Sequence, residues 1–400
     1  MNPESMPEPQ ETAFEYPLMQ EGESLDDYFL RAGEQVPHVK IELYSAAHMN
    51  YEDSKGVREM MPNADIFIPE GVGWKESDLD RKNDISVGKE DDTLKRAREK
   101  GIETADFGRA SEDALSGTGI PVVSVDLPHE EVVEREKLSA FKPDRNDRLP
   151  YEESLRVFKE GREKFAKNQL EREQYMRTHL GPKILQALRM KPELRGQNEI
   201  IVLMPLGAAH TDIFHKLKDT GTDINRTYQT SPYIYPHETE YQHRIAFGRD
   251  VDPELIERSF IEGIIFKGLN GVSNKHATPE GQLFKRIIVG LLDANDRREY
   301  FAAYQNLRSH YLDEANAKRK QFKSEFGENW QEPYRNWSMQ YVDGQLKDEI
   351  GNALRTILQR KGITVPANED EEIKFLHTHA PTEIAYIEQV KNRNLKETGV

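Results

Sequence analysis

The chain has 400 residues, of which 36% are hydrophobic and 32% charged, with a net charge of −16 and no cysteine. The acidic balance argues against a nucleic-acid partner, which normally meets a basic surface, and disfavours docking on anionic lipid. The lack of cysteine excludes disulfides, thiolate metal sites and thiol nucleophiles. The longest apolar run has ten residues, whereas a spanning helix needs roughly 20. With no secretory signal visible, we expect a cytoplasmic protein without a membrane anchor.

The N-terminal segment differs in composition from the rest of the chain. Residues 1–36 contain nine Asp or Glu residues, one Arg and several prolines. Low hydrophobicity combined with a run of like charge is typical of disorder. We therefore predict an acidic, disordered arm over residues 1–36.

Alternating strand and helix patterns begin after this arm. Residues 39–44 alternate apolar and polar side chains and predict a strand, which is followed by a helix over 51–64 and a short strand over 66–68. Residues 74–118 are charged and punctuated by glycine, which indicates an insertion. A third strand is expected over 121–126.

A long charged helix is expected next, over residues 151–190, with a break near Gly181-Pro182 because proline interrupts helical hydrogen bonding. An apolar strand over 200–206 and a helix over 212–218 come after it. Strands that alternate with helices predict an α/β fold, with a mostly parallel central sheet flanked by helices. We assign this domain to residues 37–290.

The strand signals fade toward the C-terminus. Helices are expected over 281–292, 296–325 and 334–361. We define a helical C-terminal region over residues 291–365 and a polar tail over 366–400. The C-terminal helices are candidates for a homo-oligomer contact.

Polar side chains lie at or just after the ends of the four predicted strands. These residues are His48, Glu70, Asp126 and His210, and both histidines come after three small residues. Ligands of open α/β sheets bind outside the carboxyl ends of the strands. Two imidazoles and a carboxylate at such an edge predict a metal or acid–base site, with His48, Glu70 and His210 as candidate ligands of Mn, Zn, Co or Fe.

Several short motifs share a family pattern. Gly207-Ala-Ala-His210 is a Gly-x-x-His motif, and Ser45-Ala-Ala-His48 is a similar copy with serine first. A Pro62–Asp65 turn leads into the strand that ends at Glu70, and Arg172 lies ahead of the second motif. This order resembles the TraB/PrgY and Tiki family, within a wider group that includes erythromycin-esterase-like and ChaN-like proteins. The resemblance covers about residues 37–220 and extends weakly to about 290.

The resemblance implies an α/β sheet with its site at the strand ends. Tiki-type members imply metal-dependent peptide cleavage, and TraB and PrgY members imply control of peptide pheromones. Erythromycin-esterase-like members imply hydrolysis with histidine as the base, and ChaN-like members imply haem or iron binding.

These observations favour a divalent-metal-dependent hydrolase that acts on a peptide or peptide-like substrate. Glu70 would bind the metal or act as general base. Arg172 would stabilise an oxyanion or orient Glu70, and Asp126 would fix an imidazole tautomer. Three alternatives remain: a non-catalytic protein that binds a peptide, haem or metal, a metal-independent histidine-based esterase, and a structural protein that has lost the chemistry.

Overall fold

The computed structural model describes residues 16–46, 51–71, 76–89, 95, 107–128, 130–132, 134, 149–207, 210, 212–228, 236–268, 279–366 and 368–397. The strands are β1 (His38–Ala46), β2 (Ile66–Phe67), β3 (Glu199–Gly207) and β4 (Ile224–Tyr228). The helices up to the last strand are α1 (Leu25–Arg31), α2 (Tyr51–Met60), α3 (Glu76–Ser86), α5 (Phe107–Leu115), α7 (Tyr151–Met190) and α8 (Asp212–Asp219). The later helices are α9 (His237–Ala246), α10 (Pro253–Gly268), α11 (Pro279–Gly290), α12 (Ala294–Phe326), α13 (Gln331–Tyr341), α14 (Lys347–Arg360), α15 (Glu369–His379) and α16 (Pro381–Glu397). Short 3-10 turns cover Met61–Asn63, Pro192–Gly196 and Gly327–Asn329, and a π-helical turn covers Val342–Leu346.

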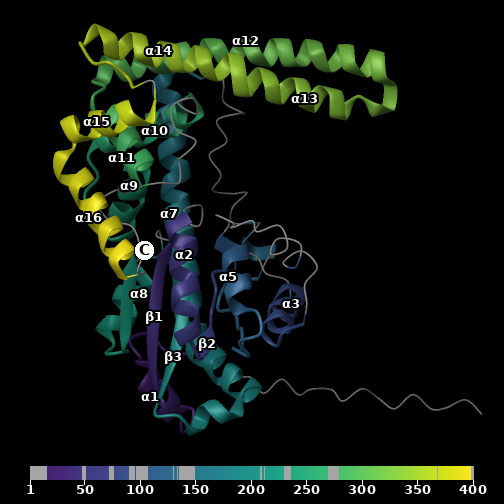
Figure 1. The fold of residues 1–400 in the computed structure, drawn as a ribbon, viewed down its shortest axis with the longest axis vertical. Helices are drawn as coiled ribbons and strands as arrows, with labels where there is room; N and C mark the ends of the chain where they lie inside the picture. The colour runs from purple at the N-terminus through teal and green to yellow at the C-terminus, as the bar shows by residue number, and fades with distance from the viewer. Residues whose placement is uncertain are drawn as a thin grey trace, which may run out of the picture.

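The four strands form one parallel sheet in the order β2-β3-β1-β4, which confirms the predicted α/β class (Figure 1). β1 and β3 pair along their full length, from His38 opposite Glu199 to Ala46 opposite Gly207. The strand expected over 121–126 is reduced to a single bridge between Val122 and Phe67. The sequence did not predict β4, because its Ile-Asn-Arg-Thr-Tyr segment has few apolar residues.

Each face of the sheet is covered by different helices. On one face, Ile41 and Val202 join a buried cluster with the C-terminal half of α7 and with α1. On the other face, Tyr44 and Phe67 pack with residues of α2 and α5. The segment predicted as an insertion over 74–118 therefore contributes α5 to the cover of the sheet.

Helix α7 is continuous from Tyr151 to Met190, so the predicted break near Gly181-Pro182 is wrong. Pro182 has no backbone N–H, which leaves the carbonyl of Thr178 without its usual helical donor. The backbone N–H of Met19 donates to that carbonyl at 2.9 Å. The N-terminal segment thus satisfies the group that proline leaves open, and the helix continues.

The N-terminal segment is ordered where the structure describes it. Residues 16–36 include α1, whose Ser24 side chain accepts a hydrogen bond from the N–H of Asp27 as an N-cap. Leu25, Tyr28 and Phe29 are buried. This differs from the disordered arm expected over 1–36, since three apolar side chains spaced on one helix face supply enough buried area to fix the segment. Residues 1–15 lie outside the described residues.

A second hydrophobic core lies in the C-terminal half of the chain. Helices α9, α10 and α11 pack there with α12, α14, α15 and α16, and Phe158 of α7 joins them. The helical region therefore begins near residue 237, before the boundary expected at 291. The tail expected over 366–400 contains α15 and α16, which bury Leu376 and Ile384 in this core.

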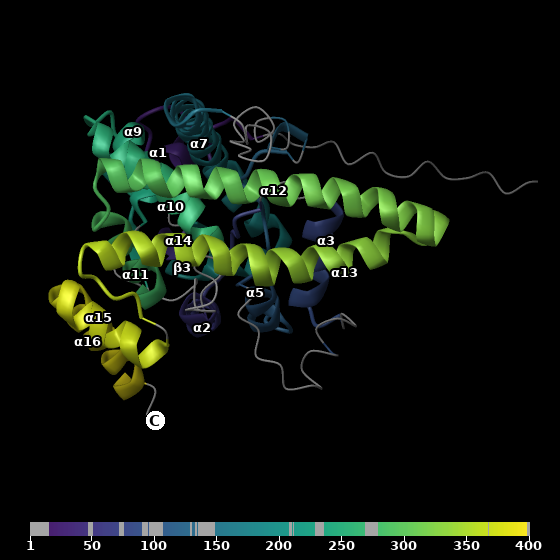
Figure 2. The same ribbon diagram turned by 90° about the horizontal axis from the view of Figure 1, so that it is seen from above.

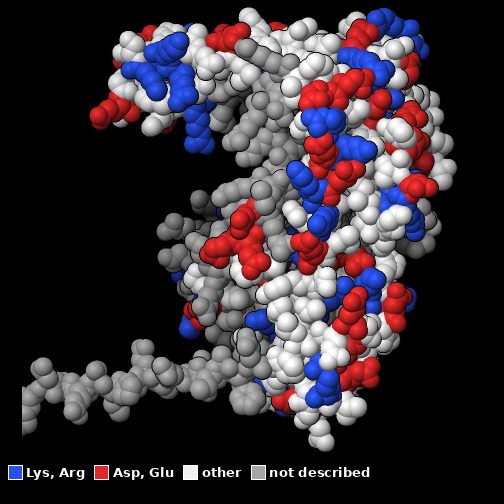
Figure 3. Space-filling model, turned by 180° about the vertical axis from the view of Figure 1, so that it is seen from behind, with Lys and Arg blue, Asp and Glu red and all other residues white. Residues whose placement is uncertain are grey.

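Helices α12 and α13 form a hairpin that extends away from the body of the molecule (Figures 1 and 2). Every described residue of α13 is at least partly exposed. On the face drawn in Figure 3, this hairpin overhangs a hollow, and basic and acidic side chains are interspersed. Within the part of the chain that the structure describes, no helix is both long and apolar enough to cross a membrane.

The contact between α1 and α7 gives a stability prediction. A methyl group at Gly181 would overlap the ring of Tyr28, whereas one at Gly263 of α10 would meet nothing within 4 Å. We expect Gly181→Ala to lower the free energy of unfolding by about 2 kcal/mol, because overpacking forces backbone shifts. Gly263→Ala, the matched control, should raise it by up to about 1 kcal/mol. Equal effects in urea unfolding would contradict the docking of α1.

Candidate functional site

His210 lies just past the carboxyl end of β3. Its backbone N–H donates to the carbonyl of Gly207 at 2.9 Å, which turns the chain back over the strand end. The side chain is 2% exposed. Two residues later α8 begins, so the imidazole is held between the end of a strand and the start of a helix.

Glu70 reaches the same point from β2. The chain past β2 stays beside β3, because the N–H of Glu70 donates to the carbonyl of Pro205 at 3.0 Å. Its Oε2 accepts from the N–H of Gly207 at 2.5 Å. Its Oε1 lies 3.2 Å from Nε2 of His210. The sequence prediction that Glu70 and His210 lie together is therefore confirmed by the geometry.

Helix α7 brings Arg172 to these strand ends. Its Nε and Nη2 donate to the two oxygens of Asp126 at 2.7 and 2.5 Å, and Nη2 also donates to Oε1 of Glu70 at 3.2 Å. Asp126 was expected to fix an imidazole tautomer, whereas both its oxygens bind Arg172. Arg172 occupies the orienting position expected for it, beside Glu70. Its pKa is raised, because the two carboxylates outweigh the effect of burial.

Two further residues of α7 contact His210, and the sequence did not predict either of them. Oε1 of Glu173 lies 3.6 Å from Nδ1 of His210, and Oε2 accepts from the N–H of Ile213 at the start of α8 at 2.6 Å. The side-chain amide of Gln169 lies 2.7 Å from Nδ1, and beside a charged imidazole it is the amide oxygen that accepts from the ring N–H. Gln169 and Glu173 are four residues apart, which places them on the same side of the helix. This spacing is the one signal in the sequence that could have identified them as a pair.

The electrostatics favour the charged form of His210. Burial alone would lower the pKa of the imidazole, but Glu70 and Glu173 on its two sides outweigh that effect and raise it to about 9. At neutral pH the site then contains three carboxylates, from Glu70, Asp126 and Glu173, and two cations, from Arg172 and His210. Buried charges are tolerated in proteins when they are paired in this way.

The structure describes two of the three predicted metal ligands, Glu70 and His210. Bonds of about 2.0–2.2 Å at tetrahedral angles place two zinc ligands about 3.4 Å apart, and the 3.2 Å between Oε1 of Glu70 and Nε2 of His210 fits that spacing. His48, the third predicted ligand, lies outside the described residues. Among the described residues, no group of three or more His, Asp or Glu side chains is arranged to hold a metal ion.

A cavity of about 390 Å³ lies beside Asp126. It is bounded by Asn83 of α3, by residues 122–124 and 126–128, and by Tyr175 of α7. The segment predicted as an insertion over 74–118 thus contributes one wall of the space beside Asp126.

Comparison with known proteins gives no match: no family model, no curated protein and no solved structure matches this chain. The resemblance to the TraB/PrgY and Tiki family stays a prediction based on the sequence motifs.

The pKa of His210 predicts how stability changes with pH. A pKa raised in the folded state means that the contribution is complete below about pH 6.5 and is lost as the pH rises toward 9. At about 1.4 kcal/mol for each tenfold change in proton affinity, the contribution is on the order of 3 kcal/mol. Urea unfolding of the wild type should show this loss between pH 6.5 and 9, and His210→Gln should not. Parallel pH dependences for the two proteins would contradict the assignment.

Proposed function

We propose that the protein is a hydrolase whose working groups are Glu70 and His210, acting on a peptide or peptide-like substrate. The observation that carries the proposal is the contact of 3.2 Å between Oε1 of Glu70 and Nε2 of His210 at the strand ends. A titratable pair that is buried, oriented by a third group and located where α/β proteins bind ligands is typical of an acid–base site.

The geometry supports distinct roles for these residues. His210 is protonated at neutral pH, so it is suited to donate a proton to a leaving amine or alkoxide rather than to accept one from water. Glu70 is suited to accept a proton from the attacking water, and it lies at hydrogen-bond distance to pass that proton to Nε2 and restore the charged imidazole. Arg172 and the N–H of Gly207 hold the carboxylate of Glu70 in place, and Asp126 positions Arg172. This differs from a histidine-based esterase, in which the imidazole must be neutral.

A divalent metal at the Glu70–His210 pair, with His48 as the expected third ligand, would replace this proton-donating role, because an imidazole that binds a metal through Nε2 carries no proton there. When bound, such an ion lowers the pKa of a water molecule and polarises a carbonyl group. Binding requires a neutral imidazole, so the proton on His210 competes with the metal.

The competition gives a prediction about metal uptake. We expect purified protein to take up Mn, Zn, Co or Fe more readily as the pH rises from 7 to 9, because His210 loses its proton over this range. His210→Gln should reduce the metal content measured by elemental mass spectrometry. His377→Gln, an exposed site on α15, is the control. Equal metal content in wild type and His210→Gln would contradict the predicted ligand set.

The hydrolase proposal itself is tested by turnover. Wild type, His210→Gln, Glu70→Gln and the control His377→Gln should be screened against peptide and ester libraries, with thermal unfolding to establish that each is folded. We expect His210→Gln and Glu70→Gln each to lose at least a hundredfold in kcat/KM, the usual scale for a lost acid–base group. The control His377→Gln should match wild type. Full activity of folded His210→Gln would contradict the proposal. Stoichiometric ligand binding without turnover would favour the non-catalytic binding protein.

A further inference from the structure

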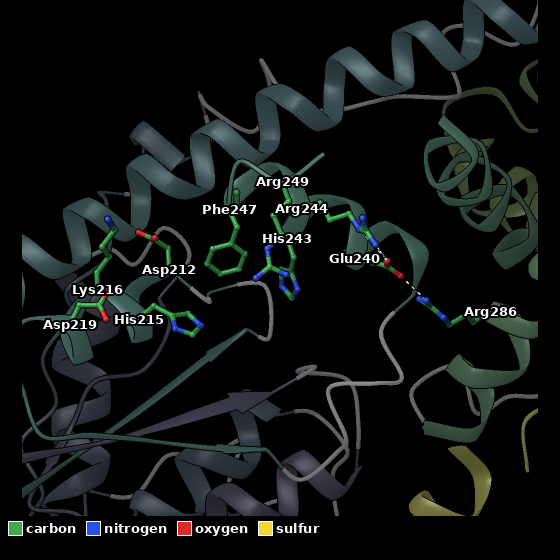
Figure 4. A pocket seen from close by; sticks show the side chains of 11 residues that line it. Asp212, His215, Lys216, Asp219, Glu240, His243, Arg244, Phe247, Arg249 and Arg286 are labelled. Carbon is green, nitrogen blue, oxygen red and sulfur yellow. Dashed lines mark hydrogen bonds and ion pairs between the residues drawn. The ribbon is translucent and has the colours of Figure 1, made fainter. Parts of the chain in front are cut away.

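A second cavity, separate from this site, lies between α8, α9 and α11 (Figure 4). Its volume is about 880 Å³, which is within the range of about 300–1,000 Å³ typical of small-molecule sites. The described residues that line it do not include Glu70, Arg172 or His210. Its ligand therefore has to be inferred from its own lining.

One wall of the cavity is a pair of fixed guanidinium groups. Glu240 of α9 bridges Arg244 on the same helix at 2.9 Å and Arg286 of α11 at 2.6 Å (Figure 4). Burial would raise the pKa of Glu240, but the two arginines outweigh it and the pKa is lowered. The carboxylate therefore stays charged and holds both guanidinium groups, and the three groups together keep a net positive charge. Cations held in place before binding lose little freedom when an anion arrives.

The end of α9 presents an aromatic ring beside a further cation. Gly248, with φ of 59°, turns the chain, and the N–H of Arg249 donates back to the carbonyl of Arg244 at 2.8 Å. The guanidinium of Arg249 then lies 5.7 Å from the ring centroid of Phe247. His215 of α8 approaches the same ring edge-on, with centroids 5.6 Å apart. Figure 4 shows these side chains around one open space.

The charge of the lining is opposite in sign to that of the whole protein. Four cations line the cavity, from Lys216, Arg244, Arg249 and Arg286, together with two histidines, against three carboxylates. A positive cavity in a chain with a net charge of −16 concentrates small anions locally.

We propose that this cavity binds a small organic anion that carries a planar ring. Arginine forks bind phosphate and carboxylate groups through paired hydrogen bonds, and the exposed ring of Phe247 offers a surface on which a planar group can stack. The volume exceeds what a simple inorganic ion needs. The anionic group is a phosphomonoester or a carboxylate, and the experiment distinguishes them.

The test is isothermal titration calorimetry on the full chain with four probes: AMP, adenosine, inorganic phosphate and benzoate. We expect one-to-one binding of AMP or benzoate that weakens as salt is added. Adenosine lacks the charge and phosphate lacks the ring, so each should bind at least tenfold more weakly than the better ring-bearing anion. Binding of AMP would assign the phosphomonoester, and binding of benzoate alone would assign the carboxylate.

Variants locate the binding within the cavity. Arg249→Ala and Phe247→Leu change exposed residues and should each reduce affinity at least tenfold while thermal unfolding stays unchanged. Arg156→Ala, an exposed arginine on α7, is the matched control, and His210→Gln should still bind the anion even if the proposed hydrolysis fails. The proposal is overturned if neither AMP nor benzoate binds, if adenosine binds as well as AMP, or if both cavity variants bind like wild type.

Discussion

Helix α7 is the element on which the rest of the structure depends. Its C-terminal half packs on the sheet, and its N-terminal half joins the helical core through Phe158. One surface of its middle carries the groups that meet the strand ends at Glu70 and His210. Pro182 lies within the C-terminal half, and the N–H of Met19 donates to the carbonyl of Thr178 that the proline leaves without a helical donor. A hydrogen bond from the N-terminal segment thus stabilises the helix that assembles the site.

The candidate site is an extended network of buried charges rather than a set of isolated polar groups. Arg172 joins Asp126 to Glu70, and Glu70 and Glu173 flank His210 on its two sides. Removing one partner from such a network leaves another charge buried and uncompensated, which costs several kcal/mol. This mutual dependence fixes the side chains in the orientations that acid–base chemistry requires.

The sequence predicted the fold class and the meeting of Glu70 and His210, because strand ends in a parallel sheet converge whatever the details of packing. Arg172 was expected beside them only from the resemblance to the TraB/PrgY and Tiki family. The sequence did not predict that residues 16–36 are ordered, since their acidic composition hides the apolar stripe that includes Tyr28 and Phe29. Glu173 was missed because its role depends on the rotation of α7 about its axis, which only tertiary packing sets. The anion cavity around Phe247 was also missed, because it combines three helices that are separated along the chain.

The most direct test of the buried network is the pKa of His210, measured by NMR on protein labelled with ¹⁵N in histidine. An imidazole that lies between two carboxylates should have a pKa near 9 in the wild type and a lower value in Glu173→Gln. An ordinary pKa near 6.5, unchanged in that variant, would mean that Glu70, His210 and Glu173 do not form the connected unit on which the proposed chemistry rests.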